Sequence, residues 1–282
     1  MRSVLILTDF SETAFRAAEY ACSLADLLKI NRIVLYHAYE IMIAATDVPV
    51  PPVKTDQELY VESMETLGLV RDRLKAMLPG TVTIDMLAEN TFLPETINQR
   101  CHEQKIDLVV MGISDRSGFE RLMAGNVTSR MLGESKYPLL LVPGDAVIGR
   151  GIKTVVFATD LKDISLLPAD QLYSFLDAFK AEVHVVNAGP VAEKEYAHET
   201  RKKAADSLHK LLDKHPASFY YIDGDNVAES ILTFSGQHHA SLIIAIPKKH
   251  GFLSGLFHKS VSKRLAYNSR IPLLCLPEGR GD

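Results

Sequence analysis

The sequence is poor in cysteine, with only three among its 282 residues. Cys22, Cys101 and Cys275 stand far apart, so they form neither a disulfide framework nor a closely spaced set of zinc ligands. Each is interpreted as a small buried hydrophobic residue in a reducing compartment. This interpretation excludes the class of small secreted domains that disulfides hold together.

Long apolar runs are also missing. A membrane-spanning helix needs about 20 consecutive apolar residues, and no stretch of this sequence approaches that length. The opening lacks the basic segment and apolar run of a signal peptide, because Asp9 and Glu12 interrupt its first hydrophobic stretch. We therefore expect a soluble, cytoplasmic protein without a membrane partner.

Strong positive charge is absent as well. Residues 1–145 hold 14 Lys and Arg against 20 Asp and Glu, and the remainder holds 17 against 15. A nucleic-acid-binding face would need a marked excess of basic residues. Nucleic acid is therefore not an expected partner.

Two common hydrolase motifs, G-x-S-x-G and H-E-x-x-H, do not occur. Two pairs of potential metal ligands are adjacent in sequence: His238 with His239, and Cys101 with His102. Adjacent helical side chains point about a third of a turn apart, so neither pair suits one metal ion. His37, inside a predicted strand, is interpreted as a packed core residue. We predict no catalytic residue and no metal site formed by the protein alone.

The sequence does contain a long internal repeat. SVLILTDFSETA near its start is matched by TVVFATDLKDIS near its middle. Residues 126–143, NVTSRMLGESKYPLLLVP, are matched by residues 260–277, SVSKRLAYNSRIPLLCLP. A repeat of this length fixes the boundary between two domains. We place these domains at residues 1–145 and 150–282.

The two copies differ in internal length. Asp9 and Asp160 are 151 positions apart, whereas Pro138 and Pro272 are 134 apart. The second copy is therefore about 17 residues shorter between these landmarks.

Strand and helix signals alternate through each half. Continuous apolar runs, such as VLILT at the start, are typical of parallel strands buried on both faces. The predicted strands span 4–8, 32–39, 81–88, 107–112, 138–143, 154–159, 182–187, 217–222, 241–246 and 272–277. The predicted helices span 11–28, 56–77, 94–103, 126–135, 168–180, 193–214, 227–238 and 260–269. Parallel neighbours require crossover connections, so each half is predicted to be a five-stranded parallel α/β sheet.

Ligands of such sheets bind beyond the carboxyl ends of the strands, where the strand order reverses. With the order 3-2-1-4-5, that point lies between the first and fourth strands. In the first half, the turn at Thr8 and Asp9 and the loop that follows Met111 should meet there.

At these segments the chain resembles the universal stress protein family. The matching features are TDFSETA after the first strand, the strand DLVVMG, the helix start GNVT and the closing YPLLLVP. Two family domains in tandem would cover nearly the whole chain. The resemblance implies two Rossmann-like domains, similar to adenine nucleotide alpha hydrolases, each with strand order 3-2-1-4-5.

ATP-binding members of that family carry G-x-x-G, nine residues, then G-[ST], with an Asp at the end of the first strand. The resemblance then places Asp9 and Ala38 at the base and residues 125–128 at the phosphates, where backbone amides at a helix start cradle oxygens. The candidate binding residues in this sequence are Thr8, Asp9, Ala38, Met111, Gly112, Ser114, Gly125, Asn126, Val127 and Thr128. An alternative is that Gly112 and Gly125 only shape the loop, and that Asp9 only fixes the turn.

Two residues depart from the family pattern in the first half. Asp115 replaces the second glycine, and Asn126 replaces the final Ser or Thr. A carboxylate repels a polyphosphate unless a metal or nearby Arg116 offsets it. The candidate cofactors are therefore ATP, ADP or AMP, with Mg only in company with the nucleotide.

The second half departs further from the pattern. Aligned on the closing PLL, Ala245 and Lys248 fall near the first two glycines, with one extra loop residue, and Lys259 takes the place of Gly125. A side chain at the last position opposes the usual ATP pose. The loop between the fourth strand and the last helix is cationic, with Lys248, Lys249, His250, His258 and Lys259. It is compatible with a small anion, but a filled or empty pocket is the favoured alternative. Lys259-Ser260 does not complete a phosphate-binding P-loop, because His258 replaces its glycine.

Three functional classes remain. The favoured one is a non-catalytic stress protein that responds to an adenine nucleotide bound in the first half. The others are a ligand-free scaffold or interaction protein and a slow ATP hydrolase. The resemblance also implies that the two closing strands pair antiparallel, giving an intramolecular pseudo-dimer, and it is compatible with a homodimer.

Overall fold

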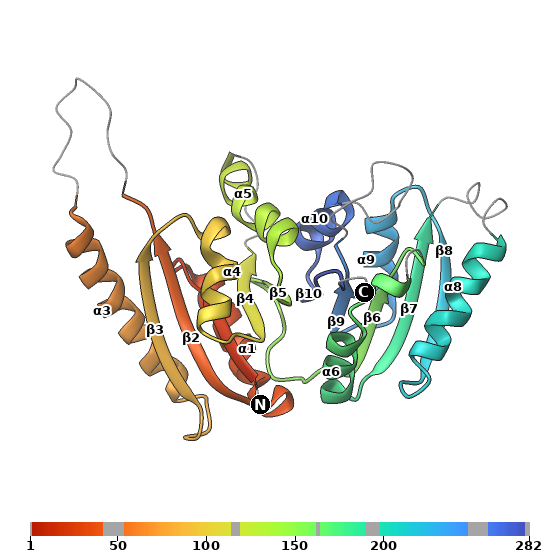
Figure 1. The fold of residues 1–282 in the computed structure, drawn as a ribbon, viewed down its shortest axis with the longest axis horizontal. Coiled ribbons are helices and arrows are strands. Elements are labelled where there is room, and N and C mark those ends of the chain that lie inside the picture. The colour runs from red at the N-terminus through yellow and green to blue at the C-terminus, as the bar shows by residue number, and fades with distance from the viewer. Residues whose placement is uncertain are drawn as a thin grey trace.

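The computed structural model describes residues 2–41, 54–113, 119–161, 164–189, 198–247 and 259–279. Its strands form one ten-stranded sheet in the order β3-β2-β1-β4-β5-β10-β9-β6-β7-β8 (Figure 1). The strands of the first half are β1 (Arg2–Leu7), β2 (Ile30–Tyr39), β3 (Thr83–Asn90), β4 (Leu108–Ile113) and β5 (Leu139–Pro143). Those of the second half are β6 (Thr154–Ala158), β7 (Glu182–Gly189), β8 (Ala217–Asp223), β9 (Leu242–Ala245) and β10 (Leu273–Cys275).

Within each half the neighbouring strands are parallel and follow the order 3-2-1-4-5, as predicted. The two halves meet where β5 pairs with β10. This pairing is antiparallel, as expected for the closing strands, and matches Leu139 to Cys275, Leu140 to Leu274 and Leu141 to Leu273. All residues of both strands are buried.

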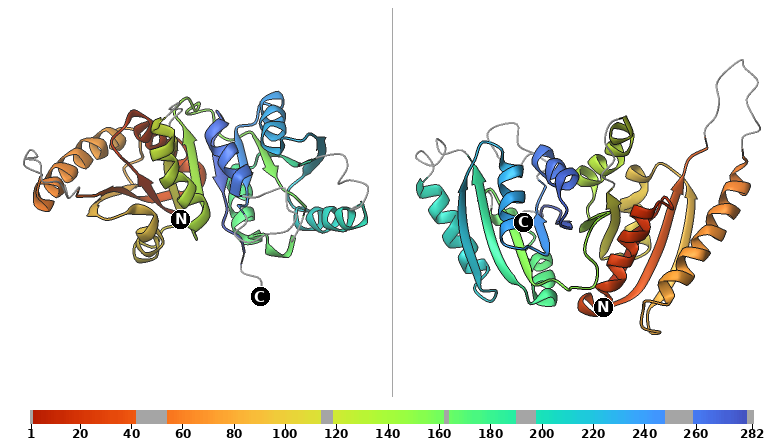
Figure 2. Two further views of the ribbon diagram at one scale, coloured as in Figure 1. Left: turned by 90° about the horizontal axis from the view of Figure 1, so that it is seen from above. Right: turned by 180° about the vertical axis from the view of Figure 1, so that it is seen from behind.

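Helices cover both faces of the sheet (Figure 2). One face carries α1 (Glu12–Ser23), α2 (Ala25–Leu28), α3 (Asp56–Lys75), α6 (Ala169–Phe179) and α8 (His198–Leu211). The other carries α4 (Leu93–Glu103), α5 (Phe119–Glu134), α9 (Val227–Gln237) and α10 (Lys259–Asn268). A 3-10 turn, η1 (Ile164–Leu166), precedes α6.

Alternation along β1 separates the two cores. Val4 and Ile6 belong to the cluster under α1, whereas Leu5 and Leu7 belong to the cluster under α4 and α5. Both clusters include residues of β5 and of β10, so each core continues across the junction of the halves.

The helix predicted for residues 11–28 is divided in two. α1 ends at Ser23, and α2 begins at Ala25. The Ser23 hydroxyl donates to the Tyr20 carbonyl at 2.7 Å, and the Leu24 amide turns to the Ala21 carbonyl at 3.1 Å. These bonds compete with the regular helical bonds and interrupt the helix.

The three cysteines are free and buried, as interpreted from the sequence. Burial raises the pKa of Cys22 and of Cys101 to about 12, so both thiols stay protonated and unreactive near neutral pH. Among the helices of the described chain, none combines the length and apolar character needed to cross a membrane.

His184 of β7 is a buried polar residue in an apolar core. It pairs with Val156 in the sheet, at the position that Val34 of β2 occupies in the first half, where Val34 pairs with Leu5. Only 4% of His184 is exposed, and its Nδ1 has no hydrogen-bond partner among the described residues. Its ring lies 5.1 Å from that of His238 and 5.2 Å from that of Tyr220, measured between centroids.

Burial lowers the pKa of His184, and the neighbouring His238 lowers it further, while Glu182 acts in the opposite direction. The imidazole of the folded protein therefore stays neutral to a lower pH than that of a free histidine. An unfolded histidine binds its proton near pH 6.5. Below that pH the unfolded state binds a proton at this histidine more readily than the folded state does. The contribution of His184 to the free energy of unfolding is therefore fully present above about pH 6.5 and is lost as the pH falls.

We expect His184→Val, which installs the residue type of position 34, to reduce this loss of stability in acid. The measurement is the urea midpoint at pH 7.5 and at pH 5.5, compared as a difference so that any change in packing cancels. His102→Gln, at an exposed position on α4, is the control and should keep the wild-type difference. An unchanged difference in His184→Val would show that this histidine does not set the acid response.

Candidate functional site

The turn after β1 is fixed by short-range hydrogen bonds. The Phe10 amide donates to Thr8 Oγ1 at 3.0 Å, and the Ser11 amide donates to Asp9 Oδ1 at 3.0 Å. Ser11 then caps α1, because its hydroxyl accepts from the Ala14 amide at 3.2 Å. Asp9 thus fixes the turn, as the alternative from the sequence proposed, and its side chain is exposed at the carboxyl edge of the sheet.

Backbone strain is built into this turn. Phe10 has φ 64°, a left-handed conformation that is uncommon for residues other than glycine. On the next strand, His37 Nδ1 lies 2.8 Å from the Thr8 carbonyl oxygen, and the His37 ring packs 4.2 Å from that of Phe10. His37 is therefore a structural residue of the turn, partly buried rather than fully packed in the core.

The second half repeats the same turn. The Leu161 amide donates to Thr159 Oγ1 at 3.1 Å, and Leu161 has φ 55°. Asn187 Nδ2 donates to the Thr159 carbonyl at 2.9 Å, in the place of His37. The difference lies in exposure, because Asp160 is only 5% exposed. The copies share a backbone design, but only the first presents its aspartate at the surface.

A cavity of about 290 Å³ opens at this turn, beyond the carboxyl ends of the first-half strands. It lies at the point between β1 and β4 where the strand order reverses. The residues that line it are Leu7, Thr8, Asp9, Ser11, Thr13, Ala14, Tyr36, Ala38, Glu40, Thr91, Phe92, Leu93, Met111, Gly112, Ile113, Val127, Thr128 and Tyr267.

The structure brings most of the sequence-derived candidates to this cavity. Its lining includes Thr8, Asp9, Ala38, Met111, Gly112, Val127 and Thr128. Gly125 and Asn126 belong to α5, and Ser114 lies outside the described residues, as do Asp115 and Arg116.

The predicted start of the last first-half helix was wrong. The sequence motif placed it at Asn126, whereas α5 begins at Phe119. Residues 119–124 include Glu, Arg, Leu, Met and Ala, which are strong helix formers, so the helix extends back through Gly125. The amides of residues 126–128 therefore lie in the helix interior, where each amide normally bonds the carbonyl four residues earlier. In this conformation they do not form an open phosphate cradle.

Sequence reasoning missed three parts of the lining. Thr91, Phe92 and Leu93 follow β3, but the strand-order argument pointed only to β1 and β4. Glu40 follows β2 directly. Its place immediately after the predicted strand 32–39 is a sequence signal for the carboxyl edge of the sheet. Tyr267 comes from the second half, and neither half alone carries a signal for it.

Gly112 has a steric explanation. A Cβ at this position would lie 2.6 Å from the Thr13 carbonyl oxygen and 2.9 Å from the Thr13 carbonyl carbon. Backbone atoms of α1 cannot move aside as a flexible side chain would. The glycine is therefore required for β4 to pass close to α1, whatever the cavity holds.

We expect Gly112→Ala to destabilise the fold by about 1–3 kcal/mol, the usual cost of overpacking. The matched control is Gly68→Ala, where a new Cβ meets nothing within 4 Å in the interior of α3. Because glycine costs a helix about 1 kcal/mol relative to alanine, the control should keep or raise the stability. Denaturant unfolding measures both changes, and a fully stable Gly112→Ala would contradict the steric explanation.

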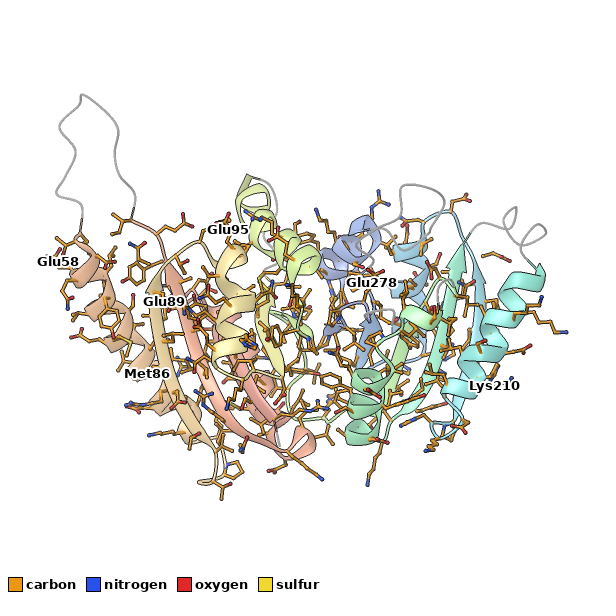
Figure 3. All side chains as sticks on the ribbon, in the orientation of Figure 1. Glu58, Met86, Glu89, Glu95, Lys210 and Glu278 are labelled. Atoms are coloured by element: carbon orange, nitrogen blue, oxygen red, sulfur yellow. The ribbon has the colours of Figure 1, made fainter. Side chains whose placement is uncertain are left out.

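The inner wall of the cavity rests on a polar network. The Tyr36 hydroxyl donates to Glu89 Oε2 at 2.8 Å, and Arg100 Nε of α4 donates to the same oxygen at 2.8 Å. Glu89, labelled in Figure 3, lies on β3. Its Oε2 accepts the hydrogen bonds from Tyr36 and from Arg100. Burial, followed by the hydrogen bond to Glu89, raises the pKa of Tyr36. Tyr36 thus stays a neutral phenol whose hydroxyl is already engaged.

The described lining of the cavity is mainly apolar and hydroxyl-bearing. Among the described lining residues there is no Lys, Arg, His or Cys, and the charged groups are Asp9 and Glu40. In the part of the chain that the structure describes, no group of three or more His, Cys, Asp or Glu is placed to hold a metal ion. Apolar walls and several hydroxyl groups can surround a small organic molecule and orient it.

Solved structures share the two-half fold. A universal stress protein from Archaeoglobus fulgidus DSM 4304 matches with a TM-score of 0.69 at 15% identity, covering 100% of this chain and 98% of that chain. A putative universal stress protein from Pseudomonas aeruginosa UCBPP-PA14 gives 0.62 at 13% identity, covering 99% and 94%. The cytoplasmic domain of a prokaryotic cation chloride cotransporter gives 0.52 at 10% identity, covering 97% and 94%. Similarity at these identities shows the fold alone.

The sequence itself identifies the family. No curated protein matches it. The sequence model of the universal stress protein family, however, matches twice, at residues 1–143 and 151–277. These matches cover nearly all of the chain and coincide with the two copies of the strand order 3-2-1-4-5. The chain belongs to the universal stress protein family.

Proposed function

We propose that this protein is a non-catalytic stress protein that responds to an adenine nucleotide bound in the first-half cavity. The observation that carries the proposal is the position of the cavity, at the reversal of strand order and beside the exposed Asp9. Asp9 and Ala38 would contact the base, and Thr128 of α5 would contact the sugar or phosphate. The function rests on this site rather than on the fold, which other proteins share.

The asymmetry of the two halves supports a single site. Asp9 is exposed and lines the cavity, whereas its counterpart Asp160 is buried. Ile246 takes the place of Gly112, because Ala245 pairs with Cys275 as Met111 pairs with Leu141. Lys259 takes the place of Gly125. One nucleotide per chain is therefore the proposed stoichiometry.

Charge in the cavity favours ligands with few phosphates. Asp9 and Glu40 both line it, and their carboxylates repel a polyphosphate. Magnesium would lessen this repulsion by neutralising part of the charge of ATP. AMP and ADP should thus bind at least as tightly as ATP without metal, and Mg²⁺ should strengthen ATP more than AMP.

The pairing of β5 with β10 supports a further part of the proposal, in which the two halves form a pseudo-dimer within one chain. The palindromic strand order is consistent with an approximate twofold axis at this junction. A cytoplasmic location is also proposed, because free, buried cysteines suit a reducing compartment.

Isothermal titration calorimetry of the whole chain with adenosine, AMP, ADP and ATP, with and without Mg²⁺, tests the proposal. We expect one site per chain and the metal dependence described above. Absence of binding for every ligand by a folded protein would leave the scaffold alternative. Phosphate release at saturating ATP would instead support the hydrolase.

Thr128→Val tests the contact with α5. The substitution keeps the side-chain volume and removes the hydroxyl of a residue that lines the cavity and is 5% exposed. Loss of one hydrogen bond of about 1 kcal/mol corresponds to roughly fivefold weaker AMP binding by calorimetry.

The repeat supplies the control for this variant. Ser262 is the second-half counterpart of Thr128, is fully buried, and its hydroxyl has no hydrogen-bond partner among the described residues. Ser262→Ala should leave AMP affinity unchanged. If Thr128→Val and the wild type bind AMP with equal affinity, the Thr128 hydroxyl does not contact the ligand.

A further inference from the structure

The cavity of the first half is lined in part by a residue of the second half. Tyr267 stands near the end of α10 and belongs to the same lining as Val127 and Thr128 of α5. α10 packs against α5, and the two helices lie side by side above the β5–β10 junction (Figure 1). The site described above is therefore incomplete without the second half.

The repeat shows that this contribution runs in one direction. With Pro138 aligned to Pro272, the counterpart of Tyr267 in α5 is Gly133. A glycine offers no side chain to the opposite half. At this pair of positions, the copy with the exposed Asp9 receives an aromatic side chain, and the copy with the buried Asp160 is offered only a glycine.

The chemistry of Tyr267 suits a ligand contact. Its side chain is partly buried and packs against the core cluster beneath α5 and α10. A tyrosine offers a flat apolar face, and it loses little conformational entropy on binding because it has few rotatable bonds.

We propose that Tyr267 directly contacts the ligand of the first-half cavity, so that the packing of α10 on α5 is coupled to occupancy of the site. This inference rests on the proposed function and adds a residue that links the site to the second half. Ligand binding would add a contact to the Tyr267 side chain and so stabilise the packing of the two helices. The second half would thus sense the ligand without binding one of its own.

The chain contains no tryptophan, which permits a direct test. Tyr267→Trp places the only tryptophan of the chain in the cavity wall, and excitation at wavelengths that tyrosine does not absorb isolates its signal. Titration with AMP should change its emission, with the same dissociation constant that calorimetry gives for this variant. Tyr221→Trp is the control, because Tyr221 is 51% exposed on β8, at the far edge of the sheet. Its emission should stay constant.

A second variant measures the contribution of the contact. Tyr267→Ala should weaken AMP binding at least fivefold while the protein remains folded, as circular dichroism verifies. Asn268→Ala, at the exposed neighbouring position of α10, should bind AMP as the wild type does.

The outcomes separate this inference from the proposed function. Absence of AMP binding by the wild-type chain would overturn both. If the wild-type chain binds AMP, and Tyr267→Trp binds AMP by calorimetry without a change in emission, only the role of Tyr267 is overturned. Unchanged affinity of a folded Tyr267→Ala would overturn it equally.

Discussion

The pairing of β5 with β10 is the constraint on which the rest of the structure depends. Without it, each half would expose a short apolar strand with unpaired backbone groups, which invites aggregation. Three residue pairs close both edges, and the cores beneath α1 and beneath α4 then run through both halves. The same pairing brings α10 beside α5, so a wall of the cavity depends on contacts distant from it in the sequence.

The strands were predictable because a strand buried on both faces needs a continuous apolar run, such as VLILT in β1 or PLLLVP at β5. The start of α5 was not, because a motif match at Asn126 competed with the helix propensity of the preceding residues, and the propensity prevailed. Gly112 was recognised as important, but its contact with the Thr13 backbone requires coordinates. Tyr267 could not be placed from sequence, because its role depends on how the halves join.

Duplication has preserved some features and altered others, and the pattern follows what each position must do. The turn after the first strand keeps its threonine hydrogen bond and its left-handed residue in both copies, at Phe10 and Leu161. That strain is present even where the aspartate is buried, so it belongs to the strand–helix connection rather than to ligand binding. Core positions have tolerated more, as His184 in place of Val34 illustrates.

Covalent linkage of the halves has a consequence for symmetry. In a homodimer every substitution appears on both sides of the axis, so a side chain that reaches across must also be accommodated in return. Here a single chain contains both halves, and each half has its own sequence. Position 267 is tyrosine, whereas its counterpart, position 133, is glycine. Because the halves are linked, matching positions can carry different residues, and the two halves are always present in a one-to-one ratio.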